Sequence, residues 1–470
     1  MQFFELINDW LWTYLMVGVL LGAALFFTIY TRGVQFRMIP QMVKLLFNSG
    51  KSHENPLDPT PKKKTISSFQ AFTVSIAGRV GTGNIAGVAI AITIGGPGAV
   101  FWMWMVALLG GANAFVESTL AQVFKVRETF AFRGGPAYYI LKGLKKRWWA
   151  MIFAVLITIT FGLANNTVQI NTIAAATRNA FGFDPFITGI VTTIIVSFII
   201  WGGIKRISRV SEIIVPVMAL AYIGVAAYII IANIRLFPNV IALIIENAFG
   251  WGPALGGGVG SAILLGVKRG LFSNEAGEGS TPNVAATAEV SHPVKQGLIQ
   301  ALGVYTDTIL ICSATAFIIL CTGMFDSGLT GVELTQASLE AQIGPVAKWF
   351  VAVAVYLFAF TTIIANYYYS ETNLEFINNS KSLLTMFRIS MIVLLLVGSV
   401  ASLDFVWVFS DISMGLMTLC NIIAILCLGK VALKCLNDYN RQLREGKDPQ
   451  FTWKNLPEYK DDLKDSWPSE

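Results

Sequence analysis

The sequence predicts an all-α, polytopic membrane protein of about eleven transmembrane helices, built as a five-plus-five inverted repeat preceded by one extra N-terminal helix. Hydrophobic residues make up 54% of the 470 residues and charged residues only 13%, too few charges to cover a soluble protein of this length. Apolar runs of about 18 residues or more, enough to cross a bilayer as a helix, recur along the whole chain. Two of these runs are interrupted by glycine-rich polar segments, and this pairing predicts the repeat.

The apolar runs predict the following spans: residues 11–31, 67–94, 98–124, 148–176, 186–203, 211–234, 255–285, 296–323, 346–369, 384–402 and 404–429. The first run follows acidic Glu5 and Asp9 and has no A-x-A cleavage site, so we interpret it as a retained span and not as a signal peptide.

The spans divide the chain into five parts. These are an extra helix (1–33), a basic segment with an interfacial helix over 34–47 (34–66), two repeats (67–234 and 235–429) and a tail (430–470). The tail mixes both charge signs and has little apolar content. This composition favours a solvated segment over a regulatory or partner-binding one.

Basic residues near the spans predict the orientation, because Lys and Arg are retained in the cytoplasm. They cluster in the first, third and fifth connections, for example at 62–64, 142–147 and 205–209, whereas the even-numbered connections hold few, such as Arg178 and Arg235. The N-terminus is therefore expected outside and the C-terminus in the cytoplasm, in a multi-pass protein of the cell inner membrane.

The two interruptions lie in the second span, at 77–84, and in the seventh span, at 268–280. Non-helical backbone at membrane depth has to be buried in protein or line a wet cavity. Spans five apart cross in opposite directions, as an inverted repeat with a central site requires. Close helix packing is another use of glycine, but it explains neither the polar residues nor the matched positions.

Such breaks suit an amino-acid ligand. Freed amides at a half-helix N-terminus bind a carboxylate, and freed carbonyls bind an ammonium group or a small hard cation. No metal or nucleophile motif is present, and we interpret the five cysteines as packing residues and His53 and His292 as non-ligands. No organic cofactor, nucleic-acid partner or enzymatic activity is expected, and the net charge of +6 reflects topology.

Several distinctive motifs lie between the second and ninth spans: VGTGNIAGV at 80–88, GGPGAVFWMWM at 95–105, GGPAYYI at 134–140, KRGLFSNEAG at 268–277 and Asp307-Thr308. Together they resemble the alanine/glycine:cation symporter (sodium:alanine symporter) family. The resemblance implies a leucine-transporter type of fold and a sodium-coupled symporter that imports a small neutral amino acid by alternating access. It implies as partners the amino acid, sodium and the bilayer, and we expect a monomer.

By the same resemblance, the substrate carboxylate meets backbone amides around the second-span break, and further side chains face the substrate. The implied substrate-binding residues are Thr82, Gly83, Asn84, Gln169, Phe272 and Asn274.

The resemblance also implies a sodium site between the second and ninth spans. The implied ligands are the carbonyls of Ala77, Val80 and Phe358 and the hydroxyls of Thr361 and Thr362. A threonine in a membrane helix commonly bonds its own backbone, but two adjacent threonines opposite a helix break favour a cation site.

One departure from the family bears on the substrate. Asn366 stands where the family commonly has tryptophan, one helical turn beyond Thr362. Asparagine leaves room and adds an amide, so we hypothesise a glutamine-preferring or asparagine-preferring member, with alanine and glycine as the family's smaller substrates. The alternative is an asparagine satisfied by neighbouring helices. Glu278 and Thr281 also depart from common family residues, with no assigned consequence.

Three alternatives stay open at this point. Protons could replace sodium as the coupling ion, with Glu275 and Glu278 as candidate titrating groups. The protein could also be a channel, but paired breaks fit a closed central site better than a pore. It could be a membrane-embedded enzyme, but the sequence has no catalytic motif.

Among the charged residues within the expected spans, we single out six. They could form gates or fixed pairs, and they are Arg79, Glu117, Lys268, Arg269, Glu275 and Asp307.

Overall fold

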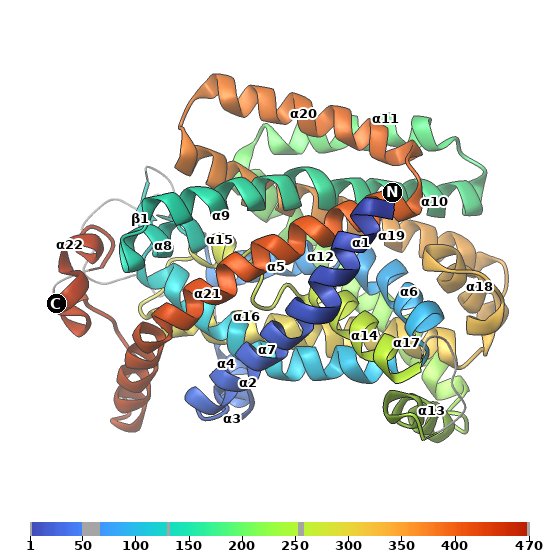
Figure 1. The fold of residues 1–470 in the computed structure, drawn as a ribbon, viewed down its shortest axis with the longest axis horizontal. Coiled ribbons are helices and arrows are strands. Elements are labelled where there is room, and N and C mark those ends of the chain that lie inside the picture. Colours follow the sequence, from blue (N-terminus) through green and yellow to red (C-terminus); the bar gives the residue numbers. More distant parts are fainter. Residues whose placement is uncertain (1, 49–65, 129–131, 252–257, 468–470) are drawn as a thin grey trace.

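The computed structural model describes residues 2–48, 66–128, 132–251 and 258–467 (Figure 1). His53 and the basic residues 62–64, on which part of the topology prediction rests, lie outside these ranges. The described chain is almost entirely helical. Its one two-stranded sheet is the hairpin of β1 (Val126–Arg127) and β2 (Phe132–Arg133), so the all-α prediction is confirmed.

Eight helical stretches of the described chain are long and apolar enough to cross a membrane. They are α1–η1–α2 (Gln2–Trp10, Leu11–Met16, Val17–Tyr30), α7 (Ala99–Val123), α9–η3–α10 (Arg147–Ile159, Thr160–Ala164, Asn165–Phe181), α12 (Gly203–Ala232), α16–η4–α17 (Pro293–Tyr305, Thr306–Cys312, Ser313–Leu320), α19 (Val346–Ile377), α20 (Lys381–Val400) and α21 (Leu403–Arg444). Of the remaining three predicted spans, two are interrupted helices and the third is the shorter α11 (Pro185–Ile200).

The second span is interrupted where the sequence predicts it. Helix α5 (Ser68–Arg79) ends at Val80, a 3-10 turn η2 (Thr82–Asn84) follows, and α6 (Ala86–Gly95) completes the span. The capping box of Ser67 and Gln70 fixes the start of α5, because each side chain bonds the other residue's backbone amide.

The seventh span breaks later than the predicted segment 268–280. Helix α14 (Gly258–Asn274) stays regular through residues 268–274, the chain is non-helical over 275–281, and α15 (Pro282–Ala285) follows. Glu275, Gly277 and Gly279 have φ values of +56°, +93° and +85°, and this left-handed backbone ends the helix. Gly270 instead serves packing, since a Cβ there would lie 3.3 Å from Met103 Cα on α7.

Short helices occupy the connections. The segment predicted as one interfacial helix over 34–47 is helical, but it forms two short helices, α3 (Val34–Arg37) and α4 (Ile39–Asn48). Helix α8 (Pro136–Leu144) lies near the hairpin, at one end of the molecule, whereas α13 (Phe237–Phe249) and α18 (Gly331–Ile343) lie at the other end (Figure 1). The apolar pattern of the sequence does not predict these last three helices, because short helices outside long apolar runs leave no span signal.

The interrupted helices lie at the centre of the packing. Helix α14 contacts both α7 and α6, α10 contacts α19, and α11 packs on α20 along the top of Figure 1. The first break approaches the last turn of α14 closely, because a Cβ on Gly83 would lie 3.0 Å from Phe272 Cδ1 and 3.3 Å from Ser273 Cα. A side chain at position 83 would require Phe272 or the α14 backbone to shift by a few tenths of an ångström.

The prediction of a solvated tail is wrong. Helix α21 continues to Arg444, and the chain beyond it folds back and buries four apolar residues, Phe451, Leu456, Leu463 and Trp467. These residues are too far apart in sequence to form an apolar run. The Trp467 indole donates to the Val123 carbonyl at the end of α7, 3.1 Å away.

Lys125 contacts this tail just beyond α7. Its ammonium group lies 4.4 Å from the centre of the Trp467 ring and 4.0 Å from that of Phe132. It also donates to Gln122 Oε1, 2.8 Å away. Burial lowers the pKa of Lys125 to about 7, although the nearby Glu289 opposes the shift.

Candidate functional site

The first break is held open by two amide side chains. The Gly81 N–H donates to Asn84 Oδ1 over 2.9 Å, and the Thr82 N–H donates to Gln169 Oε1 of α10 over 3.0 Å. A Cβ on Gly81 would lie 2.5 Å from Thr362 Oγ1 and 2.8 Å from Gln169 Oε1. Gln169 and Thr362, both predicted site residues, therefore converge on the break.

Asn84 is positioned in turn by Asp307 on η4. The Asn84 amide donates to Asp307 Oδ1 over 2.6 Å, while the hydroxyls of Ser273 and Thr308 each donate to Oδ2 over 2.8 Å. Asp307 therefore joins the two interrupted spans. The sequence analysis recognised it as part of a motif and as a buried charge, but it did not place it in the site.

Cys312 belongs to the same network. Its sulfur accepts from the Asn84 amide over 3.3 Å and lies 3.1 Å from Ser273 Oγ. The interpretation of all five cysteines as packing residues is therefore incomplete for Cys312, which also has a polar contact at the first break.

Phe272 and Asn274 lie on the last turn of α14. The Phe272 ring faces Gly83 and has its centre 4.7 Å from that of Trp407. Asn274 uses both ends of its amide locally, because its nitrogen donates to Thr308 Oγ1 over 3.2 Å and its oxygen accepts from the Ala276 N–H over 3.0 Å. In this conformation Asn274 caps α14 and is not directed at the first break.

The five predicted sodium ligands form one oxygen cluster. Thr362 Oγ1 lies 2.8 Å from Ala77 O, 3.3 Å from Val80 O and 3.0 Å from Phe358 O. Thr361 Oγ1 lies 3.0 Å from the same Phe358 oxygen. Both threonines therefore bond their own helix, as the alternative reading held. The single hydroxyl proton of Thr362 can satisfy only one of the three carbonyl oxygens around it, so the cluster has more acceptors than donors. Oxygen-rich sets of this kind suit a small hard cation.

Asn366 lies one turn further along α19. Its amide nitrogen donates to Asn166 Oδ1 of α10 over 3.0 Å. Its amide oxygen is buried and has no hydrogen-bond partner among the described residues. The neighbouring helices thus satisfy the nitrogen of Asn366 and leave an acceptor free. Buried acceptors are rarely left unpaired, so this oxygen is suited to a ligand donor.

The second break is held by Glu117 of α7, which the sequence analysis noted only as a buried charge. Its two oxygens accept from the Gly277 and Gly279 N–H groups, each over 3.1 Å, and one also accepts from the Asn421 amide over 2.8 Å. Glu117 and Gln169 therefore have similar roles, because each accepts from backbone N–H groups that an unbroken helix would satisfy internally. Glu117 does so at the second break and Gln169 at the first.

Two of the buried charges, Lys268 and Arg269, both form ion pairs with Asp411, a third buried charge that the sequence alone did not single out. Asp411 of α21 lies 2.7 Å from Lys268 Nζ and 2.6 Å from Arg269 Nη2. Its backbone oxygen accepts from the Trp12 indole of η1 over 3.1 Å. The extra N-terminal helix is thereby tied to α14 and α21.

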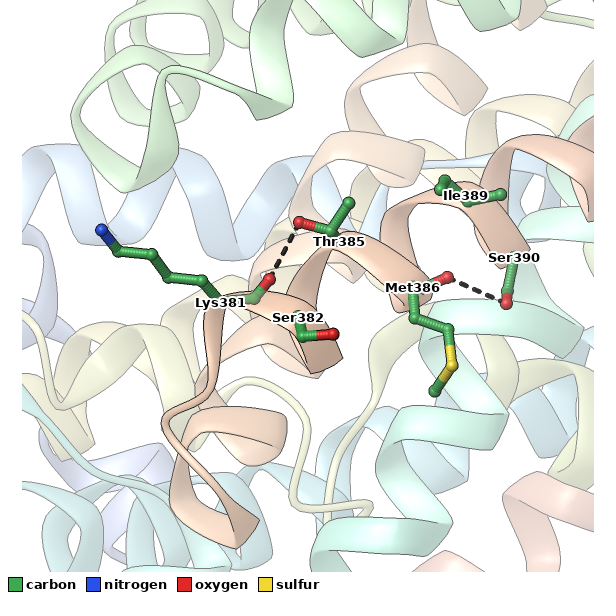
Figure 2. Close-up of a pocket in the computed structure, with 6 residues that line it drawn as sticks. All are labelled: Lys381, Ser382, Thr385, Met386, Ile389 and Ser390. Carbon is green, nitrogen blue, oxygen red and sulfur yellow. Dashed lines mark hydrogen bonds between the residues drawn. The ribbon is translucent and has the colours of Figure 1, made fainter.

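A surface groove lies away from this site, along α20 (Figure 2). It is lined by Lys381, Ser382, Thr385, Met386, Ile389 and Ser390. The hydroxyls of Thr385 and Ser390 donate to carbonyls of their own helix, over 2.8 Å and 3.0 Å. None of the predicted site residues lines it, so the groove is separate from the candidate site.

Comparison with known proteins shows the family to which the chain belongs. The chain is 50% identical over 467 residues to the probable sodium/glutamine symporter GlnT of Bacillus subtilis, covering 98% of this chain and 95% of that one. It is 51% identical over 450 residues to the amino-acid carrier protein AlsT of the same organism, covering 96% and 94%.

Among solved structures, the chain is similar to MhsT in complex with L-phenylalanine. The TM-score is 0.56 at 14% identity, covering 80% of this chain and 96% of that one. This likeness concerns the fold, which is of the predicted leucine-transporter type. A profile of the sodium:alanine symporter family matches residues 1–453. The chain therefore belongs to the sodium:alanine symporter family.

Proposed function

We propose that the chain is a sodium-coupled symporter that imports a small neutral amino acid, with glutamine preferred over alanine and glycine. Membership of the family supports sodium-coupled amino-acid symport. The observation that carries the proposal is the oxygen cluster around Thr362, which directly adjoins the polar break at Gly81 to Asn84.

Sodium would bind at the Thr362 cluster. The carbonyls of Ala77, Val80 and Phe358 and the hydroxyls of Thr361 and Thr362 would be its ligands. These ligands come from α19 and from the C-terminal end of α5, so a bound ion would hold the two helices together. Its binding would stabilise the unwound segment that follows Val80.

The substrate carboxylate would bind the amides of the first break. Since Gln169 already accepts from the Thr82 N–H, the amides of Gly83 and Asn84 are the better candidates. Phe272 would close one side of the site. Asn274 would act indirectly, by fixing the end of α14.

The side chain of the substrate would extend toward Asn366. The Asn366 amide oxygen is unpaired and is a hydrogen-bond acceptor, so it would complement the carboxamide N–H₂ donor of glutamine. Alanine and glycine offer no donor at that position. A binding site discriminates against a substrate that leaves one of the site's buried polar groups without a hydrogen bond. Alanine and glycine would leave the Asn366 oxygen unpaired, which supports glutamine as the preferred substrate.

Coupling would follow from the shared segment. The ion and the carboxylate both require the backbone from Ala77 to Asn84 in its unwound form, so each would favour binding of the other. Sodium moving down its gradient would supply the work, about 2.3 kcal/mol for each charge crossing about 100 mV. Alternating access would then expose the site to each side in turn.

The same proposal places the chain in the plasma membrane as a multi-pass protein, with the N-terminus outside and the C-terminus in the cytoplasm. The basic third connection and the folded tail lie at one end of the molecule, and α13 and α18 lie at the other (Figure 1), which supports this orientation. The protein would act as a monomer, without an organic cofactor and without enzymatic activity.

Equilibrium binding tests the site. Labelled glutamine is titrated onto the purified protein in sodium buffer and in choline buffer of equal ionic strength, with unlabelled alanine as competitor. We expect at least tenfold tighter binding in sodium and weaker competition by alanine than by glutamine. Equal affinity for glutamine in the two buffers would contradict the sodium site and would favour the alternative hypothesis, a proton-coupled symporter.

A further inference from the structure

Glu278 lies in the middle of the break between α14 and α15 and is 0% exposed. Neither of its carboxyl oxygens has a hydrogen-bond partner within the described part of the chain. Its neighbour Glu275, by contrast, accepts from the hydroxyls of Ser280 and Thr281 over 2.7 Å and 3.1 Å. Glu278 is therefore a buried carboxyl group that the surrounding structure leaves unsatisfied.

The charged and titratable groups that face Glu278 come from several elements. They are Glu275 in the same break, Glu117 on α7, Arg79 at the end of α5 and Tyr369 on α19. Arg79 donates to the Gln300 carbonyl over 3.1 Å, while its Nε and Nη2 have no partner in the described structure. One cation thus faces three carboxyl groups in a region closed to water.

An ionised Glu278 does not fit this environment. Burying a carboxylate is costly unless it is paired and hydrogen-bonded, and Glu278 has neither kind of bond. The amides that could stabilise it, those of Gly277 and Gly279, donate instead to Glu117. A neutral carboxyl group would remove the third negative charge from the cluster.

We propose that Glu278 is a proton-binding site, which holds a proton while the break is buried, as it is here, and releases it to water when the break opens. The O–H bond of the carboxyl group breaks, water takes the proton, and the carboxylate that remains is solvated. A second sodium ion suits the position less, because the nearby hydroxyls of Ser280 and Thr281 are already bonded to Glu275.

This site goes beyond sodium coupling, because Glu278 is not one of the proposed sodium ligands. Protonation would favour the closed break, and a more alkaline compartment facing the open break would favour opening. Transport would then depend on pH even though sodium drives it. The dependence belongs to Glu278 and not to the sodium ligands, which lie on α5 and α19.

The first test measures glutamine uptake by proteoliposomes under a fixed sodium gradient, with the external pH constant and the internal pH varied from 6 to 8.5. We expect the rate to change at least threefold for the unmodified protein and less than 1.5-fold for Glu278→Gln. Glu333→Gln, which alters an exposed carboxyl group on α18, is the matched control and should behave as the unmodified protein does. An unchanged pH dependence in Glu278→Gln would overturn the proposal.

A second measurement needs neither substrate nor sodium, so its result is independent of the proposed function. Unfolding exposes Glu278 to water, where it ionises, so the native state binds more protons than the unfolded state and its stability falls as pH rises. Lys125 acts in the opposite direction in all three proteins, so the variants are compared with the unmodified protein. The change in thermal midpoint from pH 6 to pH 8.5 should be more positive in Glu278→Gln and Glu278→Met than in the unmodified protein. Parallel curves for all three proteins would refute proton binding at Glu278.

Discussion

Thr362 Oγ1 lies 2.8 Å from the carbonyl oxygen of Ala77 and so connects α19 to the last turn of α5. The same hydroxyl lies 3.3 Å from the Val80 carbonyl, the last before the unwound segment. The contact places the proposed ion site directly beside the amides proposed for the substrate carboxylate. Ion and substrate thus share a backbone segment, which is the physical basis that we propose for coupling.

Replacing Thr362 by valine keeps the volume and removes the oxygen. We expect Thr362→Val to raise the sodium concentration for half-maximal uptake at least tenfold, equivalent to about 1.4 kcal/mol, whereas Thr362→Ser should stay within threefold of the unmodified protein. Thr385→Val is the control, because Thr385 bonds its own helix far from the site. Equal sodium dependence in Thr362→Val and Thr385→Val would contradict the assignment.

Asn366 should set the preference for the substrate side chain. Asn366→Trp fills the space and Asn366→Leu removes the free acceptor at similar volume. We expect both to lower the ratio of glutamine uptake to alanine uptake about tenfold, since a lost hydrogen bond in a buried site is worth about 1–2 kcal/mol. Competition uptake with the two labelled amino acids gives the ratio. A ratio that stays the same in both variants would exclude Asn366 from specificity.

Gly81 has no room for a side chain. A methyl group there would lie 2.5 Å from Thr362 Oγ1 and 2.8 Å from Gln169 Oε1, so Gly81→Ala has to displace both groups. We expect sodium-driven uptake to fall at least tenfold. Gly224→Ala on α12, which meets nothing within 4 Å, should remain within twofold. If Gly81→Ala transports as well as Gly224→Ala, the break is not the site that we describe.

Lys125 predicts a pH effect on stability. Its pKa of about 7 lies below its usual value of 10.5 because the group is buried. Between these two values the unfolded state holds more protons than the native state, so stability rises with pH across that window. The gain from pH 7 to pH 9 should be about 2 kcal/mol. Lys125→Met should lose it, as followed by thermal unfolding in detergent at the two pH values.

The sequence alone predicts the fold class and the approximate position of every long span, because apolar length and paired breaks are local signals. It also predicts the two ends of the oxygen cluster, Ala77 and Thr362, through family resemblance. What it misses are contacts between distant elements. Asp307 bonding Asn84, and Glu117 bonding the second break, require the tertiary arrangement.

The tail and the seventh span show the limits of composition. Phe451 and Trp467 are isolated apolar residues in a charged segment, yet both are buried against the helical body. Lys268 and Gly270 look like helix-breaking residues, yet α14 continues through them, because Lys268 pairs with Asp411 and Gly270 packs against α7. In each case a distant partner decides the local structure.

Uptake of labelled glutamine and alanine into proteoliposomes, under an imposed sodium gradient at equal pH on both sides, tests sodium-coupled symport most directly. We predict that an inward sodium gradient concentrates glutamine in the vesicles, that alanine accumulates less, and that replacing external sodium by choline abolishes both. Accumulation that is unaffected by removal of sodium and is driven by an imposed pH gradient instead would contradict the proposal.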